Sequence, residues 1–145
     1  MALNLVKAGT DDLAYLLQLR KTSMGEHFAR AGLFLSEEDH LFRLQDGFEY
    51  CFIIVRNRAA VGMIKYQVLE DKIDIMQVQI SPDFQGQGIG KTILQQLLSD
   101  AERDGKKVML SVLKQNPAQN LYHKLGFKTV GEDEDEFYME WSGSL

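Results

Sequence analysis

Cysteine, proline and long apolar runs are scarce in this sequence. Cys51 is the only cysteine, so an intramolecular disulfide is excluded and a reducing, cytoplasmic compartment is expected. With two prolines and no low-complexity tract, neither linkers nor repeat units are indicated. No apolar run approaches the ~20 residues of a membrane span, and MALNLVKAGTDD lacks the features of a signal peptide. We therefore expect no membrane association.

Basic residues are also in the minority. Sixteen Lys and Arg against 21 Asp and Glu give a formal net charge of −5. Nucleic-acid binding depends on clustered positive charge, so this balance argues against a nucleic-acid partner and favours a cationic one. The most acidic run is GEDEDE at 131–136, which either attracts amines or forms a solvated hairpin tip.

A chain of 145 residues with 45% hydrophobic content fits a single domain, residues 1–145. β-rich and alternating runs predict about seven strands: ALNLVKA, FEYCFIIVR, AAVGMIKYQVLE, KIDIMQVQI, KKVMLSVL, FKTV and EFYMEW. The pairs Asn57-Arg58 and Glu70-Asp71 read as tight turns.

Helical signals separate these runs. We expect Thr10 to cap one helix and Ser36 to open a capping box in a second that ends near Gly47. An apolar stripe predicts a third helix over 88–104, and a fourth follows Asn116. The fold class is therefore α+β (mixed α/β), with a mixed sheet flanked by about four helices. Residues 23–35 have no clear period, and we expect a substrate-side element there.

The stretch ISPDFQGQGIGKT, residues 80–92, resembles a phosphate-binding loop. A nucleotide triphosphate loop would need glycine at Gln85, and a dinucleotide fingerprint would need glycine at Lys91, so both motifs fail. What remains is a strand, a loop and a helix whose first N–H groups favour an anion.

Two motifs together resemble the GNAT superfamily of N-acetyltransferases. Gln85 to Gly90 matches the [R/Q]-x-x-G-x-[G/A] loop of that family, and NPAQNLYHKLGF at 116–127 resembles its N-x-A-x-x-L-Y-x-x-L-G-F segment. The resemblance implies a single GNAT-like domain, acetyl-CoA as co-substrate and no metal. Residues 20–50 carry no motif of the family.

The resemblance also implies which residues hold the cofactor. Three glycines would let N–H donors approach the pyrophosphate, and the whole loop would contribute, namely Gln85, Gly86, Gln87, Gly88, Ile89, Gly90 and Lys91. The pantetheine amides would lie along the backbone of Val78-Gln79-Ile80, where the fourth strand splays from the fifth. A backbone N–H there would polarise the thioester carbonyl.

Asn116 and Tyr122 each allow two interpretations. Asn116 either caps the last helix or contacts pantetheine, and the two roles are compatible. Tyr122 lies on the apolar face of that helix, yet the matching tyrosine of the family places its hydroxyl by the CoA sulfur. There it would protonate the leaving thiolate or donate a hydrogen bond to it.

The general base is harder to assign. Some GNAT members carry a glutamate five residues before the motif asparagine, where this chain has Ser111. Others carry one at the position of Asp74, which by strand parity would face the same side as Val78 and Ile80. Asp74 is thus the candidate base, and His27, Glu26, His40 and water chains are its rivals.

We therefore expect an N-acetyltransferase that moves acetyl from acetyl-CoA to a primary amine by direct attack in a ternary complex. The alternatives are a non-catalytic acyl-CoA sensor, favoured by Ser111, and a nucleotide-hydrolysing protein, favoured by Gly90-Lys91-Thr92. The acceptor, a small-molecule or protein amine, is left open by the sequence, as is the oligomeric state, a homodimer included.

Overall fold

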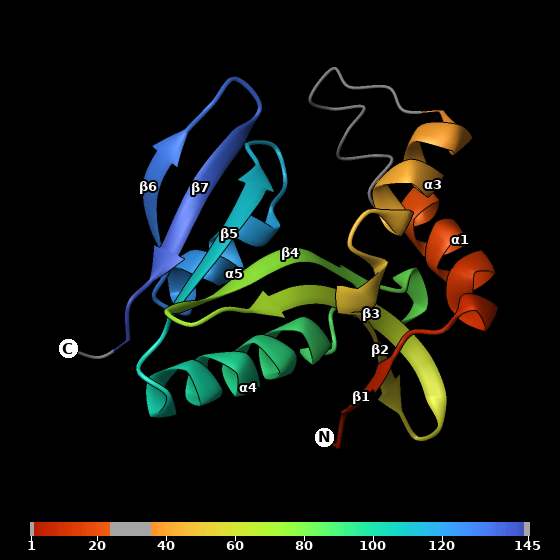
Figure 1. Ribbon diagram of the computed structural model, residues 1–145, viewed down its shortest axis with the longest axis horizontal. Helices are drawn as coiled ribbons and strands as arrows, with labels where there is room; N and C mark the ends of the chain where they lie inside the picture. Colours follow the sequence, from red (N-terminus) through yellow and green to blue (C-terminus); the bar gives the residue numbers. More distant parts are fainter. Residues whose placement is uncertain (1, 24–35, 144–145) are drawn as a thin grey trace.

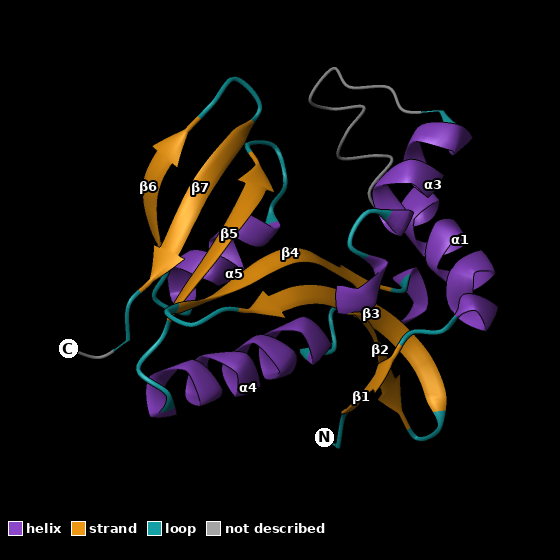
Figure 2. Cartoon of the chain, in the orientation of Figure 1, coloured by secondary structure: helices purple, strands orange, loops and turns teal. Residues whose placement is uncertain are grey.

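The computed structural model describes residues 2–23 and 36–143, which form one seven-stranded sheet with helices on both faces (Figures 1 and 2). The strands are β1 Asn4–Lys7, β2 Cys51–Arg56, β3 Ala59–Val68, β4 Lys72–Ile80, β5 Lys107–Leu113, β6 Lys128–Glu132 and β7 Glu136–Trp141. The α-helices are α1 Leu13–Ser23, α3 Glu37–Gln45, α4 Ile89–Arg103 and α5 Ala118–Lys124. Short 3-10 turns occupy Thr10–Asp12, Phe48–Tyr50 and Pro82–Phe84.

The predicted α+β class, with about seven strands and four helices, is confirmed for the described residues. The predicted element at 23–35 lies outside them, apart from Ser23 at the end of α1. No helix within the described ranges is both long and apolar enough to cross a membrane.

The strand order is β1-β2-β3-β4-β5-β7-β6. β4 and β5 are parallel, joined by α4, whereas each other neighbouring pair is antiparallel. The turn between β2 and β3 is tight because Asn57 (φ 53°) and Arg58 (φ 67°) both adopt the left-handed conformation that such hairpins require.

Two apolar cores cover the two faces of the sheet. The larger lies under α4 and α5 and includes Ile93, Leu97 and Phe127. The smaller lies under α1 and α3 and includes Leu16, Leu44 and Met63. Figure 1 shows α4 along one face and the α1 and α3 pair beyond the other, near β3 and β4. The stripe predicted for 88–104 is the buried face of α4.

The helix caps agree with the sequence at Ser36 and differ at Thr10. Ser36 Oγ accepts from Asp39 N–H at 3.1 Å, and Asp39 accepts from Ser36 N–H at 3.2 Å, as in a capping box. The prediction that Thr10 is a cap was wrong, since Gly9 holds that position. Asp12 accepts from Gly9 N–H at 2.8 Å, and this bond moves the start of the turn one residue earlier.

Candidate functional site

A gap between β4 and β5 forms the centre of the candidate site. The two strands are paired from Lys72 with Lys107 to Ile75 with Leu110, and their pairing ends there. Beyond this point β4 stays paired with β3, and β5 stays paired with β7, so the two halves of the sheet diverge, as Figure 1 shows. The edge of β4 that we expected to hold pantetheine faces this gap.

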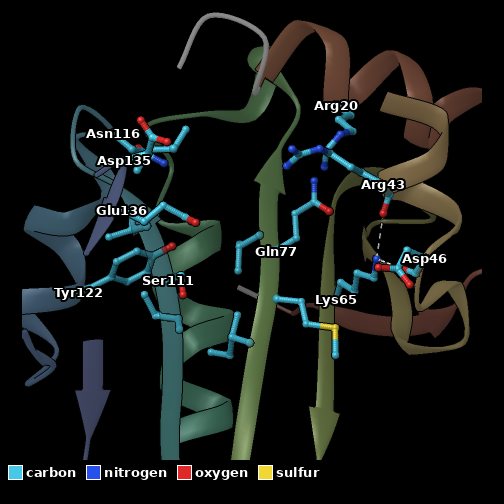
Figure 3. A pocket seen from close by; sticks show the side chains of 16 residues that line it. Arg20, Arg43, Asp46, Lys65, Gln77, Ser111, Asn116, Tyr122, Asp135 and Glu136 are labelled. Atoms are coloured by element: carbon cyan, nitrogen blue, oxygen red, sulfur yellow. Dashed lines mark hydrogen bonds between the residues drawn. The ribbon is translucent and has the colours of Figure 1, made fainter. Parts of the chain in front are cut away.

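A cavity of about 420 Å³ lies at the gap (Figure 3). One wall comes from α1, α3 and β3 and carries Arg20, Arg43 and Lys65. The opposite wall comes from α5 and the start of β7 and carries Tyr122 and Glu136. The first wall is mainly cationic, although Asp46 at the end of α3 also lines it, and the opposite wall carries the Glu136 carboxylate.

Glu136 is a partly buried acidic side chain that lines the cavity. It opens β7 opposite Leu113, the last residue of β5, and Figure 3 shows it beside Tyr122. Burial, followed by the nearby Asp133 carboxylate, raises its pKa, although Arg43 acts in the opposite direction. A raised pKa makes the ionised carboxylate a stronger proton acceptor.

The acidic run 131–136 is divided between a hairpin tip and the wall of the cavity. Asp133 folds the hairpin tip, because one carboxylate oxygen accepts from the N–H groups of Asp135 and Glu136 and the other from Tyr138 Oη at 2.6 Å. Glu136 instead lines the cavity together with Asp135. Glu136 was not predicted from the sequence as an individual residue. Its position at the first residue of a strand was the available signal.

A second hollow, of about 600 Å³, lies at the start of α4. The predicted loop residues line it, with the exception of Gln87. The rest of the lining comes from Ile80, Phe84, Leu121 and Lys124. Gly86 (φ 77°) and Gly88 (φ 80°) adopt left-handed conformations, and a Cβ built on either would meet no atom within 4 Å. The space in front of this loop is therefore open to a ligand, and the first N–H groups of α4 are available to an anion. The geometry fits the pyrophosphate of acetyl-CoA.

Known proteins resemble this chain in sequence and in fold. A family model described as the acetyltransferase (GNAT) domain matches residues 22–142. This chain belongs to the GNAT acetyltransferase family. Its match to the [ribosomal protein bS18]-alanine N-acetyltransferase of Haemophilus influenzae is 31% identical over 78 residues, 53% of each chain, so it spans about half of that relative.

Two further similarities cover nearly the whole GNAT chain. The spermidine N(1)-acetyltransferase of Thermoplasma acidophilum is 24% identical and is matched over 97% of both chains. The crystal structure of the PaiA N-acetyltransferase from the same organism, in complex with coenzyme A, superposes with a TM-score of 0.73. Its sequence identity is 22%, and the match covers 98% of this chain and 99% of that one, which shows a common fold.

The GNAT motif residues Asn116 and Tyr122 both line the cavity. Asn116 Oδ1 accepts from Ala118 N–H at 2.9 Å, so the predicted cap is present, and its amide nitrogen stays available as a donor to a ligand. Tyr122 is buried and packs on Phe127 with 5.7 Å between ring centroids. Burial raises the pKa of Tyr122 to about 12.

Asp74 does not share a face with Val78 and Ile80, so the parity prediction was wrong. In the register, Lys65 pairs with Gln77 and Tyr66 with Ile75, which leaves Met76 as a bulge. The extra residue inverts the alternation: Ile75 and Val78 both contact the core under α4, and Asp74 faces the other side. Asp74 is also not among the residues lining the cavity.

The other two edge residues differ from each other. Gln79 is paired with Met63, on the α1 side of the sheet, and its side chain is buried without lining either hollow. The predicted contact of Gln79 with pantetheine would therefore come from its backbone, and it stays a prediction. Ile80 lines the second hollow, and its carbonyl accepts from Gln85 Nε2 at 3.1 Å.

Of the rival bases, His40 alone falls within the described residues, and it does not line the cavity. His27 and Glu26 lie outside the described residues. His40 is buried and accepts from Arg20 Nε at 3.2 Å through Nδ1, so this nitrogen carries no proton. Burial lowers the pKa of His40, as do Arg20, Lys21 and Arg43, whereas Asp39 raises it.

This lowered pKa makes stability depend on pH. Unfolded His40 binds a proton at higher pH than folded His40 does, so folding stability should be lost as the pH falls below about 6.5. His40→Gln preserves an acceptor for Arg20 but does not titrate, and should therefore flatten the decline. Chemical denaturation between neutral and acid pH measures this. His123→Gln, at an exposed site on α5, is the control, and an equal flattening in the control would rule out His40 as the cause.

The glycine loop gives a further prediction. Gly88→Val should weaken CoA binding by at least about tenfold, or ~1.4 kcal/mol, because its side chain would hold the pyrophosphate away from the N–H groups. Gly105→Val is a matched control, since Gly105 also has a positive φ, 68°, and open space at its Cβ. Isothermal calorimetry with CoA should find the control close to wild type. Equal losses in both variants would indicate general backbone strain.

Proposed function

We propose that this protein transfers the acetyl group of acetyl-CoA to a primary amine, with both substrates held together at the β4–β5 gap. The observation that carries this proposal is the cavity at the diverging strands, with Tyr122 and Glu136 on one wall. Acetyl-CoA supplies an activated thioester. The amine forms a C–N bond with the acetyl carbon, the C–S bond breaks, and one proton is released overall from a protonated amine.

Glu136 is the residue assigned to the proton of the amine. An amine with a pKa near ~10 is almost fully protonated at neutral pH and cannot attack until it loses a proton. The Glu136 carboxylate lies in the cavity, and its neighbours Asp133 and Glu134 are exposed to solvent, so a proton accepted there has a route to water. The glutamate missing at Ser111 is replaced in this scheme by Glu136, which reaches the same cavity from β7.

Tyr122 is assigned to the sulfur. A hydroxyl with a pKa of about 12 stays protonated throughout the neutral range, and a thiol titrates near ~8.5. Full proton transfer from the hydroxyl to a thiolate is therefore uphill. Of the two predicted roles, these values favour a hydrogen bond that stabilises the leaving thiolate, with the final proton coming from solvent.

Thiol release tests the proposal. Acetyl-CoA and a panel of amines are mixed with the protein, and free CoA is measured for small-molecule amines, peptide N-termini and lysine side chains. Melting curves with CoA, ATP and NAD at equal concentration accompany the assay, and CoA alone should raise the melting temperature. Stabilisation by acetyl-CoA without release across the panel would support the acyl-CoA sensor instead. Stabilisation by ATP alone would support nucleotide binding.

A further inference from the structure

The cavity has a cationic corner, which we define as the side chains of Arg20, Arg43 and Lys65. They come from α1, α3 and β3, and all three line the cavity. Figure 3 shows Arg20 and Arg43 reaching toward the same region, close to Gln77 of β4. This local charge is opposite in sign to the net charge of −5 on the chain.

Two members of the cationic corner are held by the protein rather than by water. Arg20 is 5% exposed, and its Nε donates to His40. Lys65 is also 5% exposed, and its Nζ donates to the backbone carbonyl of Arg43 at 3.2 Å and to that of Asp46. An ammonium has three N–H donors, so these two bonds fix its place and leave one donor for a ligand. Solvated surface lysines are not held in this way.

Bringing these cations together costs free energy. Burial and the nearby Arg43 lower the pKa of Arg20 to about 10. Burial also lowers the pKa of Lys65, and Arg20 adds to this effect, whereas Cys51, Asp46 and Glu49 act in the opposite direction. A bound anion would reverse these costs, because a carboxylate accepts charge-assisted hydrogen bonds from guanidinium and ammonium groups together.

We propose that the cationic corner binds a carboxylate of the acceptor, so that the acceptor is an amine that also carries a carboxylate, as in an amino acid. This inference rests on the proposed acetyl transfer. The carboxylate would bind at Arg20, Arg43 and Lys65, and the amine would point across the cavity to Glu136. The charges on the two walls match the two ends of such a molecule.

A purely cationic acceptor fits this cavity less well. The overall charge and the acidic run 131–136 predicted such an acceptor from the sequence. A diamine reaching Glu136 with one end would place its second ammonium near Arg43, where like charges repel. The acid end of the acceptor, rather than its amine alone, is therefore the feature that the cavity recognises.

Matched acids and amides test the proposal. Each ω-amino acid or α-amino acid is compared with its own primary amide and with a diamine of similar length, and rates are expressed per free amine. The acid should exceed its amide by at least about tenfold in kcat/KM, the size expected for hydrogen bonds to charged groups. Equal rates for acid and amide, or a preferred diamine, would overturn the carboxylate site and leave acetyl transfer intact.

Arg43→Gln links that preference to the cationic corner. Arg43 is an exposed residue on α3, so its replacement should not prevent folding. The variant should lose about tenfold in kcat/KM for acids and change little for amides, whereas Arg43→Lys should retain part of the preference. Lys7→Gln, which removes the same charge from the exposed edge strand β1, should behave as wild type. Equal losses for acids and amides in Arg43→Gln would overturn the assignment.

Calorimetry without turnover separates the two proposals. With CoA in place of acetyl-CoA, wild-type protein should bind an acid more tightly than its amide, and Arg43→Gln should bind the two alike. A protein that binds the acids selectively but never acetylates an amine would contradict the proposed function and not the carboxylate site. Equal binding of an acid and its amide by the wild-type protein, like equal rates, would overturn the carboxylate site.

Discussion

Glu136→Gln is expected to slow acetyl transfer by about 100- to 10 000-fold at neutral pH, the range measured for removal of a general base. Glutamine has the same shape but cannot accept the amine proton, so the loss should shrink as the pH rises toward the amine pKa of ~10. In the wild type, kcat/KM should fall as the pH drops through the raised pKa of Glu136, because the protonated carboxyl is inactive.

The folding stability of Glu136→Gln, unlike its rate, should not fall at neutral pH. The folded pKa of Glu136 lies above its ordinary value, so its ionised form costs folding free energy once the pH exceeds the unfolded value. Removing the charge with glutamine should leave the protein as stable as wild type or more so at neutral pH. Glu134→Gln, on the exposed hairpin tip, is the matched control. A similar rate loss in the control, or none in Glu136→Gln, would assign the base elsewhere.

Tyr122→Phe should reduce turnover by roughly 10- to 1000-fold with little effect on CoA affinity. The ring that packs on Phe127 is retained, and only the hydroxyl is lost. Because this hydroxyl has a pKa of about 12, the loss should be the same at every pH in the neutral range, unlike that of Glu136→Gln. Comparing the two pH profiles of kcat separates support of the sulfur from removal of the amine proton.

Tyr66→Phe is the control for this second experiment. Tyr66 is a half-buried tyrosine that stacks on Phe52 and does not line the cavity. Its replacement should leave kcat unchanged. If Tyr122→Phe also has wild-type kcat and the enzyme is active, the hydroxyl has no part in the reaction and Tyr122 belongs only to the core.

The elements that depend on local patterns were predictable. Alternation located the strands, Ser36 and Asp39 indicated a capping box, and the spacing of Gly86, Gly88 and Gly90 indicated the loop that precedes α4. These patterns lie within a few residues of the feature that they predict. They are readable because neighbouring side chains and backbone groups satisfy one another directly.

Other features depended on distant parts of the chain. The bulge at Met76 arises from pairing with β3, so strand parity alone misplaced Asp74. The cationic corner brings together Arg20, Arg43 and Lys65 from three elements. The sequence around each of these residues gives no sign that the other two lie close to it in space. Glu136 was concealed within an acidic run whose other members belong to a hairpin tip.

The short register between β4 and β5 has a consequence for how the protein opens. Four residue pairs join two blocks of sheet, β1–β4 and β5–β7, so their backbones can exchange hydrogen with solvent as partly independent cooperative units. A pantetheine chain bonded along the β4 edge would bridge this boundary. We expect amide protection to differ between the two blocks in the free protein and to rise in both when the ligand binds. The ligand would pair with β4 as an added strand does, and the two blocks would then unfold together.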